Sequence, residues 1–518
     1  MDSNALIFGK SGLKKIVALE VQDHEAEIFV QAEDGSVTSH IIPNRFWLLC
    51  SEQADSNFVR LKGDLHYCWG RQYLDKQTWG RDRSAYKNMG FDTYSIYDAQ
   101  EALMTKDGIC YYQDLKQKDV SVLSFDLETT GLDGLAPDAK VILISTTYRD
   151  VKGSTNKLFS HDEYKDERSM IEAFCTYVRE VDPSIVMGHN VMTYDFVYLS
   201  SRAHKIGAKL KLGRDGSVIT FEKYPSNFRM DGTRTLEYFN AHIYGREIVD
   251  TYFLASAYDV SKSIESYALK PMIKQLGLEK EGRQHYDASQ IRFKYMIPEE
   301  MEKIKQYAID DAEDPIKLFD LMGPLYFNMS TMMSMPFSKI VLSASGKKIN
   351  GMLVRAYLQQ GHSIPKPDES RKFQGAISFA VPGVYSNCFK IDLAALYPSI
   401  QLEYEVCNFD KDPKGYILEL IRTFRAKRLE YKKLAADTGD KYWIEMDTTA
   451  KGILNSFYGS QGCPGINFNS FDCAEFITAK GREILEYTIK WASGMDESEI
   501  AKLIGVDTEE SEEEDETA

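Results

Sequence analysis

The C-terminal half of the chain is organised around one stretch, Phe389-Lys-Ile-Asp392-Leu-Ala-Ala-Leu-Tyr397-Pro-Ser-Ile400. Its apolar residues surround a single carboxylate, which predicts a buried strand that carries Asp392 to its end and turns at Tyr397-Pro398 into a helix. A carboxylate in apolar surroundings is costly unless it binds a cation or accepts hydrogen bonds. Asp392 is therefore either a metal ligand or the cap of the following helix, and this stretch favours neither reading.

The same stretch resembles the first palm motif of family B DNA polymerases, D-x-x-S-L-Y-P-S, with Ala395 in place of the usual Ser. The resemblance implies that Asp392 binds both catalytic cations and that the backbone carbonyl of Leu393 binds one of them. It also implies that the ring of Tyr397 blocks a ribose 2′-hydroxyl, so the expected substrate is a deoxynucleotide.

The length and composition predict a globular, multidomain protein. A chain of 518 residues with 43% hydrophobic residues is too long for one core and suggests about three or four domains. The sequence has no run of 18 apolar residues and no secretory leader, so we expect no membrane partner and a cytoplasmic location. The eight cysteines form no C-x-x-C pair, which predicts reduced thiols rather than disulfides or a zinc site.

The net charge of −16, taken alone, argues against a nucleic-acid partner, because affinity for phosphate backbones comes from clustered Lys and Arg. The charges are unevenly distributed, however. Residues 507–516 hold eight acids in ten positions, whereas residues 422–433 hold six basic residues in twelve. The acidic average therefore does not argue against DNA binding.

Three carboxylate motifs follow a strand-rich N-terminal segment of about 115 residues. In Val120-Ser-Val-Leu-Ser-Phe-Asp126-Leu-Glu128 an apolar strand presents two acids at i and i+2, hence on one face, where they repel unless a cation binds. A second apolar strand runs through Gly188-His-Asn190 into a helix that carries Asp195. Further along, Tyr307 and Asp311 lie four residues apart and share a helix face.

Together the three motifs resemble those of the DEDDy 3′–5′ exonucleases, D-x-E, N-x-x-x-[FY]-D and Y-x-x-x-D. Taken singly, each also occurs by chance on strand edges and helices, and their order carries the prediction. The neighbouring Asp310 is the ambiguous position, and we choose Asp311 because it is at i+4 from Tyr307. The predicted metal ligands, for two Mg²⁺ or Mn²⁺ ions about 3.5–4 Å apart, are Asp126, Glu128, Asp195 and Asp311. Tyr307 is expected to orient the attacking water.

A helical hairpin is predicted after the palm motif. Residues 415–435 form a basic helix with an apolar stripe of Ile417, Leu418, Ile421, Phe424 and Leu429, and a second helix runs from about Trp443 to Gly459. The second helix matches the fingers motif of family B, K-x-x-x-N-S-x-Y-G, in full. The resemblance implies that Lys451 and Arg425 neutralise a nucleoside triphosphate, and that Asn455 and Tyr458 border the base pair.

Two family elements are missing from the sequence: the Y-G-D-T-D-S hairpin, which supplies the second palm carboxylate, and a helical thumb. Asp507, followed by Glu509, is a weak candidate for the missing ligand because it lies in an acidic run. One carboxylate cannot by itself hold a two-metal site for nucleotide transfer. We therefore expect a second chain to supply the remaining palm motif and the thumb, as in the split family B polymerases of archaea and viruses.

The expected fold class is α+β and multidomain, with an RNase H-like α/β exonuclease domain, a partial palm with an antiparallel sheet, helical-hairpin fingers and no thumb. The predicted domains are an N-terminal domain (1–115), the exonuclease domain (116–325), a connector (326–380), an incomplete palm (381–409 and 460–495), fingers (410–459) and a disordered acidic tail (496–518).

The expected function is that of the large subunit of a split DNA-directed DNA polymerase with a proofreading exonuclease, acting on primer–template DNA and dNTPs in a prokaryotic or viral replication context. The alternatives are a free-standing 3′–5′ exonuclease or DNA-binding subunit with an inactive polymerase half, and a non-enzymatic scaffold.

Overall fold

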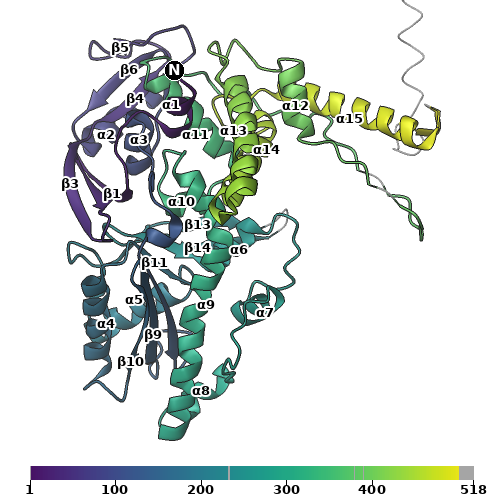
Figure 1. Cartoon of the computed structure of the whole chain (residues 1–518). Helices are drawn as coiled ribbons and strands as arrows, with labels where there is room; N and C mark the ends of the chain where they lie inside the picture. Colours follow the sequence, from purple (N-terminus) through teal and green to yellow (C-terminus); the bar gives the residue numbers. More distant parts are fainter. Residues whose placement is uncertain (1, 231–233, 379, 389, 497, 501–518) are drawn as a thin grey trace, which may run out of the picture. The chain divides into compact units, whose positions relative to one another are not determined.

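The computed structural model describes residues 2–230, 234–378, 380–388, 390–496 and 498–500 (Figure 1). These residues form two compact units. The larger unit comprises residues 8–48 and 71–343, and the smaller unit comprises the described residues within 1–7, 49–70 and 344–518. In the described part of the chain, no helix is long and apolar enough to cross a membrane.

The N-terminal part of the larger unit is rich in strands, as predicted. An antiparallel sheet has the order β1 (Ile16–Gln22), β2 (Glu25–Gln31), β3 (Val37–Pro43). A two-residue turn joins β1 to β2, and in it Asp23 has a positive φ of 43°, a conformation that Asp tolerates better than most residues. Two helices, α2 (Lys76–Asn88) and α3 (Ala99–Asp107), each begin at an Asp whose side chain accepts a backbone N–H hydrogen bond.

A five-stranded sheet positions the candidate site. Its order is β10 (Gly153–Ser160), β9 (Val141–Asp150), β8 (Val122–Thr129), β11 (Ile185–Gly188), β16 (Glu247–Asp250). The first three strands are antiparallel, whereas β8, β11 and β16 run parallel. Because β8 and β11 are neighbouring parallel strands, their carboxyl ends meet at one edge of the sheet. This α/β sheet agrees with the fold expected for an RNase H-like domain.

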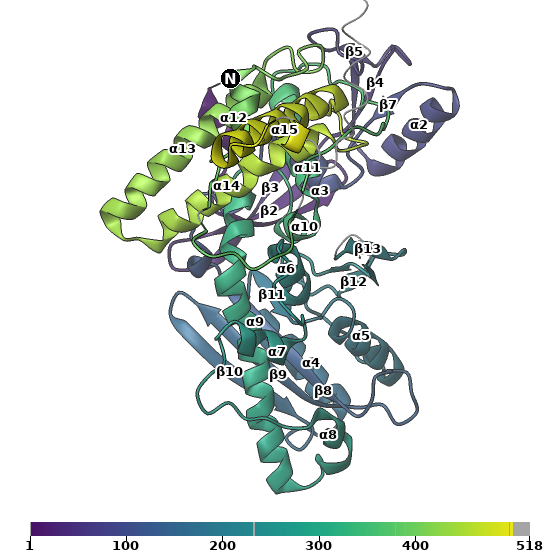
Figure 2. The same ribbon diagram turned by 90° about the vertical axis from the view of Figure 1, so that its right-hand side faces the viewer.

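Helices cover both faces of this sheet (Figure 2). On one face, Leu123, Phe125 and Leu127 of β8 join a core with residues of α4 (Glu167–Val181) and α5 (Asp195–Ile206). The 33-residue helix α9 (Pro298–Ser330) packs against β8 and β9, and its residue Tyr307 joins a second core. Successive strand residues face opposite sides, so Asp126 and Glu128 lie on the face opposite Leu127. The prediction that the two acids share a face is confirmed.

The other elements of the larger unit are shorter. They are η1 (Gln117–Asp119), β12 (Thr220–Phe221), β13 (Ser226–Arg229), β14 (Thr235–Tyr238), β15 (Ala241–His242), α6 (Thr251–Tyr258), α7 (Leu269–Gln275), α8 (Ala288–Lys294), α10 (Phe337–Leu342) and β7 (Thr93–Tyr94). The methionines at 329, 332, 333 and 335 are buried, so this group packs in the core of the unit. All eight cysteines are free thiols.

The smaller unit is mainly helical. Its helices are α11 (Ser345–Leu358), α12 (Leu396–Glu403), α13 (Tyr416–Thr438), α14 (Lys441–Gln461) and α15 (Phe471–Ser493). The remaining short elements of the chain are α1 (Ser3–Phe8), β4 (Phe46–Cys50), β5 (Val59–Arg60) and β6 (Trp69–Tyr73).

Helices α13 and α14 pack against each other as the predicted helical hairpin. Gly439 ends α13 with a φ of 66°, and the side chain of Asp440 then accepts the N–H of Tyr442 at the start of α14. An ion pair between Arg428 and Asp447, at 2.8 Å, links the two helices. The prediction that Leu429 belongs to the apolar stripe of α13 is wrong, because its side chain is largely exposed.

The predicted buried strand around Asp392 is wrong. Among the described residues from 365 to 500 there is no β-strand, so the antiparallel sheet expected for the palm is absent from this part of the structure. Every described residue from 380 to 394 is exposed, Asp392 included. A strand is stable only when its backbone N–H and C=O groups pair with a neighbouring strand. The described part of the smaller unit offers this segment no such neighbour.

Candidate active site

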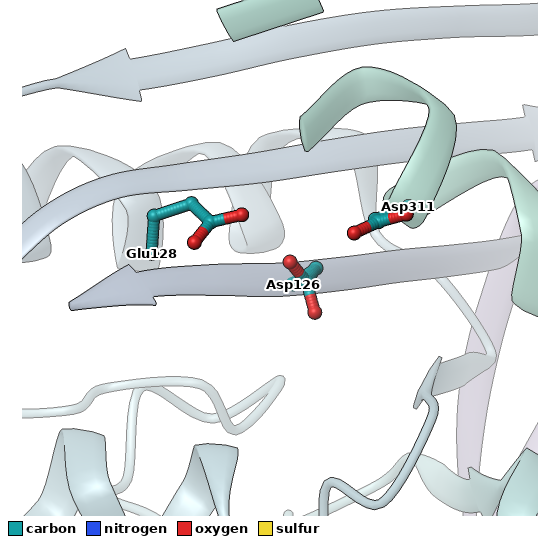
Figure 3. A group of neighbouring side chains, drawn as sticks. All are labelled: Asp126, Glu128 and Asp311. Atoms are coloured by element: carbon teal, nitrogen blue, oxygen red, sulfur yellow. The ribbon is translucent and has the colours of Figure 1, made fainter. Parts of the chain in front are cut away.

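The centre of the candidate site is a group of three carboxylates. Asp126 and Glu128 project from β8, and Asp311 projects toward them from α9 (Figure 3). One oxygen atom from each of the three lies within 4.8 Å of the others, and Glu128 and Asp311 are buried. Oxygen-rich groups of this kind suit hard divalent cations such as Mg²⁺ or Mn²⁺.

The geometry favours Asp311 over its neighbour Asp310, the ambiguous position in the sequence. Asp310 lies outside the three-carboxylate group and points to the loop after α7. It accepts hydrogen bonds from Lys280, at 3.5 Å, and from the backbone N–H of Gln284, at 3.1 Å. Its contacts therefore tether a loop.

Asp195 is the fourth acid of the predicted set. It is the first residue of α5 and is buried, but it lies outside the group of three. Its charge nevertheless acts on this group, because it raises the pKa of both Asp126 and Glu128. The structure therefore brings three of the predicted ligands into direct proximity and keeps the fourth within electrostatic reach.

Burial and mutual repulsion hold the pKa values of these acids far above normal. Burial raises the pKa of Asp126 most, followed by the charges of Glu128, Asp195 and Asp311. For Glu128, burial and then Asp311 raise the pKa to about 8. Burial, followed by Asp250, raises the pKa of Asp195 to about 8. Four acids so close together cannot all ionise without compensating positive charge, which is the electrostatic condition that a pair of divalent cations satisfies.

Two cationic side chains and one tyrosine complete the site. The Nζ of Lys270 lies 3.3 Å from Asp311, contacts the hydroxyl of Tyr307 and sits 4.1 Å from the centre of its ring. Arg283 donates to Asp311 at 2.5 Å. Burial, followed by the charge of Asp311, raises the pKa of Tyr307 well above its usual value. Tyr307 therefore remains protonated and can donate or accept a hydrogen bond beside the carboxylates.

Sequence reasoning missed Asp250 as a positioning residue. Its carboxylate accepts the backbone N–H groups of Asn190 at 2.8 Å and Met192 at 3.0 Å, and that of Tyr252 at 2.9 Å. It thus fixes the Asn190 segment at the end of β11 and caps α6. The available signal was an Asp at the end of an apolar strand, directly before a helix.

The side chain of His189 has a structural role. Its imidazole lies 3.0 Å from Thr251 Oγ1 and 2.8 Å from the Tyr267 carbonyl. Burial lowers the pKa of His189 to about 4, so the ring is neutral.

The raised pKa values predict a pH-dependent stability in the absence of metal. Glu128 and Asp195 titrate near pH 8 when folded, but near pH 4 when unfolded. The folded state therefore binds more protons across this range, and the free energy of unfolding falls as the pH rises from about 4 to about 8. We expect excess Mg²⁺ at about pH 8 to restore the lost free energy of unfolding.

We also expect Glu128→Gln to stabilise the metal-free protein at about pH 8 by roughly 1–3 kcal/mol, since one pKa unit is about 1.4 kcal/mol.

Thermal denaturation with EDTA and with Mg²⁺, at both ends of this pH range, measures the effect. A midpoint that does not depend on pH or on Mg²⁺ would show that the carboxylates are not under electrostatic strain.

The polymerase-motif residues lie in the smaller unit. Asp392 does not cap a helix: α12 begins after Ala395, whose φ is 51°, and no side chain caps it. The cap reading is therefore wrong. Asp392 is exposed, and the neighbouring Leu393 is 41% exposed, so neither has the buried position that the sequence predicted.

Tyr397, Tyr458 and Gly481 come together around α12. The rings of Tyr397 and Tyr458 lie 4.4 Å apart, with an angle of 44° between their planes. Gly481 of α15 permits this arrangement, because a Cβ atom added there would meet the Tyr397 ring at 3.0 Å. On the hairpin, Lys451 and Asn455 are exposed, one turn apart on α14, and Arg425 is exposed on α13. Asp507 and Glu509 lie outside the described residues.

Two family models match parts of this chain. The family model for the exonuclease domain of DNA polymerase family B matches residues 93–272, and that for DNA polymerase family B matches residues 408–517. The chain belongs to family B of the DNA polymerases. The exonuclease match includes Asp126, Glu128 and Asp195, whereas Tyr307 and Asp311 lie beyond it. The polymerase match includes the hairpin but begins after Asp392.

Several archaeal DNA polymerases are similar to this chain. The chain is 25% identical over 456 residues to a DNA polymerase of Pyrococcus glycovorans, an alignment that covers 80% of this chain and 56% of the relative. It is 26% identical over 407 residues to a DNA polymerase of Archaeoglobus fulgidus, covering 73% and 48%. The chain thus spans about half the length of these curated relatives.

A solved structure shares the fold. The family B DNA polymerase from the hyperthermophilic archaeon Pyrobaculum calidifontis superposes with a TM-score of 0.73 at 19% identity, over 92% of this chain and 72% of that one. This likeness shows an α+β multidomain fold similar to that of a family B polymerase.

Proposed function

We propose that the larger unit removes nucleotides from the 3′ end of single-stranded DNA. The observation that carries this proposal is the group of buried carboxylates on β8 and α9, with the Tyr307 hydroxyl beside it. The ligands for two divalent cations would be Asp126, Glu128, Asp195 and Asp311. Such a pair of cations activates water and stabilises the leaving 3′ oxygen of a phosphodiester.

The chain's own residues supply the positioning. Tyr307 orients the attacking water through its hydroxyl, and Lys270 holds this hydroxyl and offsets part of the negative charge. A cavity of about 820 Å³ begins beside Asn190 and runs to Leu269, the residue before Lys270. Its lining includes Tyr252 and Tyr267, aromatic rings of the kind on which DNA bases stack. These features support entry of a single strand from this side.

Replacing Tyr307 with Phe tests the role of its hydroxyl. We expect kcat for single-strand degradation to fall by about 10–100-fold, with little change in KM, because the variant loses a positioning contact but no charged ligand. Steady-state kinetics on a single-stranded oligonucleotide measure both constants. An unchanged kcat would contradict the role assigned to the hydroxyl.

For the smaller unit we propose template-directed addition of dNTPs. Asp392 and the carbonyl of Leu393 would bind the catalytic ions, and Tyr397 would exclude a ribose 2′-hydroxyl. Lys451 and Arg425 would bind the triphosphate, while Asn455 and Tyr458 border the base pair. The exposure of Lys451 and Asn455 on one side of α14, and the packing of Tyr397 against Tyr458, support this arrangement. The primer 3′-hydroxyl would attack the α-phosphate and release pyrophosphate.

This half also needs a second carboxylate beside Asp392, and we propose that another chain supplies it. Two surfaces of the smaller unit support this. The first is the exposed segment 380–394. If residues 390–393 paired as a strand, Ile391 and Leu393 would face one side, while Lys390 and Asp392 faced the other. A partner strand beside it would therefore place its own polar face next to Asp392.

The second surface is the C-terminal half of α15. The buried residues of this helix end at Gly481, although apolar side chains continue to Trp491. Tyr487 is 62% exposed and Trp491 is 79% exposed. Exposed apolar surface of this extent marks an interaction site more often than a free surface. If residues 390–393 joined a sheet, Ile391 and Leu393 would lie on its apolar face. This face could pack against the exposed apolar side chains of α15.

Replacing Trp491 with Glu tests the second surface. We expect this variant to weaken binding of the second chain by at least about 10-fold, since burying an unpaired charge costs more than 1.4 kcal/mol. Calorimetry on the two purified chains measures the affinity, and Lys490→Glu is the matched control at an exposed neighbour. Equal affinities for wild type and Trp491→Glu would exclude α15 from the interface.

Primer extension distinguishes a two-chain polymerase from a free-standing exonuclease. The chain carrying Asp126→Asn, which prevents degradation of products, is incubated with Mg²⁺, primed template and dNTPs, with and without the second chain. That chain is sought in the neighbouring reading frame, as a short protein with a D-T-D strand and a helical thumb. We expect extension only when both chains are present. Degradation by the wild type, without extension under either condition, would instead favour a free-standing exonuclease.

A further inference from the structure

A buried guanidinium lies behind the carboxylate group of the larger unit. Arg283, in the loop between α7 and α8, donates through Nη2 to Asp311 Oδ1 at 2.5 Å and through Nη1 to the carboxylate of Asp314. Its side chain is 2% exposed, and Asp314 is fully buried. No carboxylate motif in the sequence pointed to this arginine.

The two cations that contact Asp311 are held differently. Lys270 lies 3.3 Å from Oδ2 on a flexible side chain that is 37% exposed. Arg283 is a planar group buried between two acids, and Asp314 in turn pairs with Lys317 at 2.8 Å. An incoming metal ion can therefore displace Lys270 at much lower cost than Arg283.

We propose that Arg283 is a positioning residue of the exonuclease site. Its guanidinium fixes the Asp311 carboxylate in the orientation that meets Asp126 and Glu128, and so raises the affinity of the site for divalent cations. This inference rests on the proposed exonuclease function. The carboxylate of Asp314 balances the charge of Arg283, so its effect on the metal is orientation more than repulsion. Groups that orient metal ligands in this way typically change metal affinity by about 10–100-fold.

Anchoring the loop is a simpler role for Arg283, but the loop has other anchors. Lys280 contacts Asp310 at 3.5 Å and Glu313 at 3.2 Å, and the backbone N–H of Gln284 donates to Asp310. The loop therefore keeps three links to α9 when Arg283 is replaced. Lys280→Ala is the matched control, because it loosens the same loop without touching Asp311.

Mn²⁺ binding to the full chain, without DNA, tests the proposal. Electron paramagnetic resonance of free Mn²⁺ is followed during titration, in an Asp392→Ala background that removes the polymerase ligand. We expect Arg283→Gln to weaken binding by about 10–100-fold and Arg283→Lys to weaken it less. Lys280→Ala should stay within about 2-fold of the unchanged site.

The buried Asp314 loses a partner in Arg283→Gln. If that variant does not fold, the double variant Arg283→Gln/Asp314→Asn replaces it, with Asp314→Asn alone as its reference. Mn²⁺ affinity equal to that of the parent would overturn the proposal, and so would tighter binding, which would show that Arg283 competes with the metal. Weaker Mn²⁺ binding in a chain whose wild type degrades no DNA would refute the exonuclease function and leave only the role of Arg283 in orienting Asp311 for a metal ion.

Discussion

Replacing Asp126 with Asn is expected to slow degradation of single-stranded DNA by roughly 10³-fold or more, a loss of about 4 kcal/mol of transition-state stabilisation. Asp126 lies on the central strand of the sheet, and its charge interacts with those of Glu128, Asp195 and Asp311. An amide has the same shape as the carboxylate but only one oxygen and no charge. It cannot hold a divalent cation in a site that depends on summed negative charge.

Single-turnover degradation of a 5′-labelled oligonucleotide measures this loss. Asp310→Asn is the matched control, since Asp310 lies one residue from Asp311 yet points to Lys280 and Gln284. We expect this control to retain activity to within about 3-fold. Equal losses in Asp126→Asn and Asp310→Asn would mean that general damage to the domain, and not a lost ligand, explains the effect. The melting temperature of metal-free Asp126→Asn should not fall, because the substitution removes one of several repelling charges.

The exonuclease part was predictable because two of its three motifs each lie within one element. The i, i+2 spacing of Asp126 and Glu128 fixes a common strand face, and the i, i+4 spacing of Tyr307 and Asp311 fixes a common helix face. Parallel pairing of β8 and β11 then brings the ends of two such elements to one edge. The order of these local patterns, together with their resemblance to the exonuclease motifs, therefore led to the residues that the structure groups together.

The contacts that surround these motifs were not predictable. Arg283 reaches the site from the loop between α7 and α8, and Asp250 reaches it from the end of β16. No spacing in the sequence links Arg283 to Asp314 or Asp250 to Asn190. The position of Asp195 outside the group of three also depends on how α5 packs on the sheet. Contacts of this kind are set by packing in three dimensions, which periodicity does not encode.

The error at Asp392 has a different physical origin. Apolar residues around the acid predict a strand, but strand formation depends on pairing partners far away in sequence or in another molecule. The hairpin of α13 and α14 was predicted to within a few residues because a helix closes its own hydrogen bonds. The structure thus agrees with the sequence at this hairpin and departs from it at Asp392, where the described residues offer the expected strand no neighbour.

In the proposed two-chain enzyme, Asp392→Asn is expected to slow nucleotide addition by roughly 10³-fold or more, while degradation of single-stranded DNA stays within about 2-fold. The two activities separate because Asp392 lies in the smaller unit and Asp126 in the larger. The loss arises because Asp392 is the proposed palm ligand of the two cations, and an amide there would leave the carboxylate proposed for the second chain without its counterpart.

Single-nucleotide incorporation, with Asp126→Asn present in every sample, measures the loss without interference from degradation. Asp410→Asn, an exposed acid in the same unit, is the matched control and should leave incorporation unchanged. The affinity for the second chain should also be unchanged in Asp392→Asn, because that residue would face the metal site and the apolar residues beside it would face α15. An Asp392→Asn enzyme that binds its partner and still adds nucleotides at the normal rate would remove Asp392 from the chemistry. A chain that extends primers at full rate without any partner would remove the need for the second carboxylate, and with it the two-chain proposal.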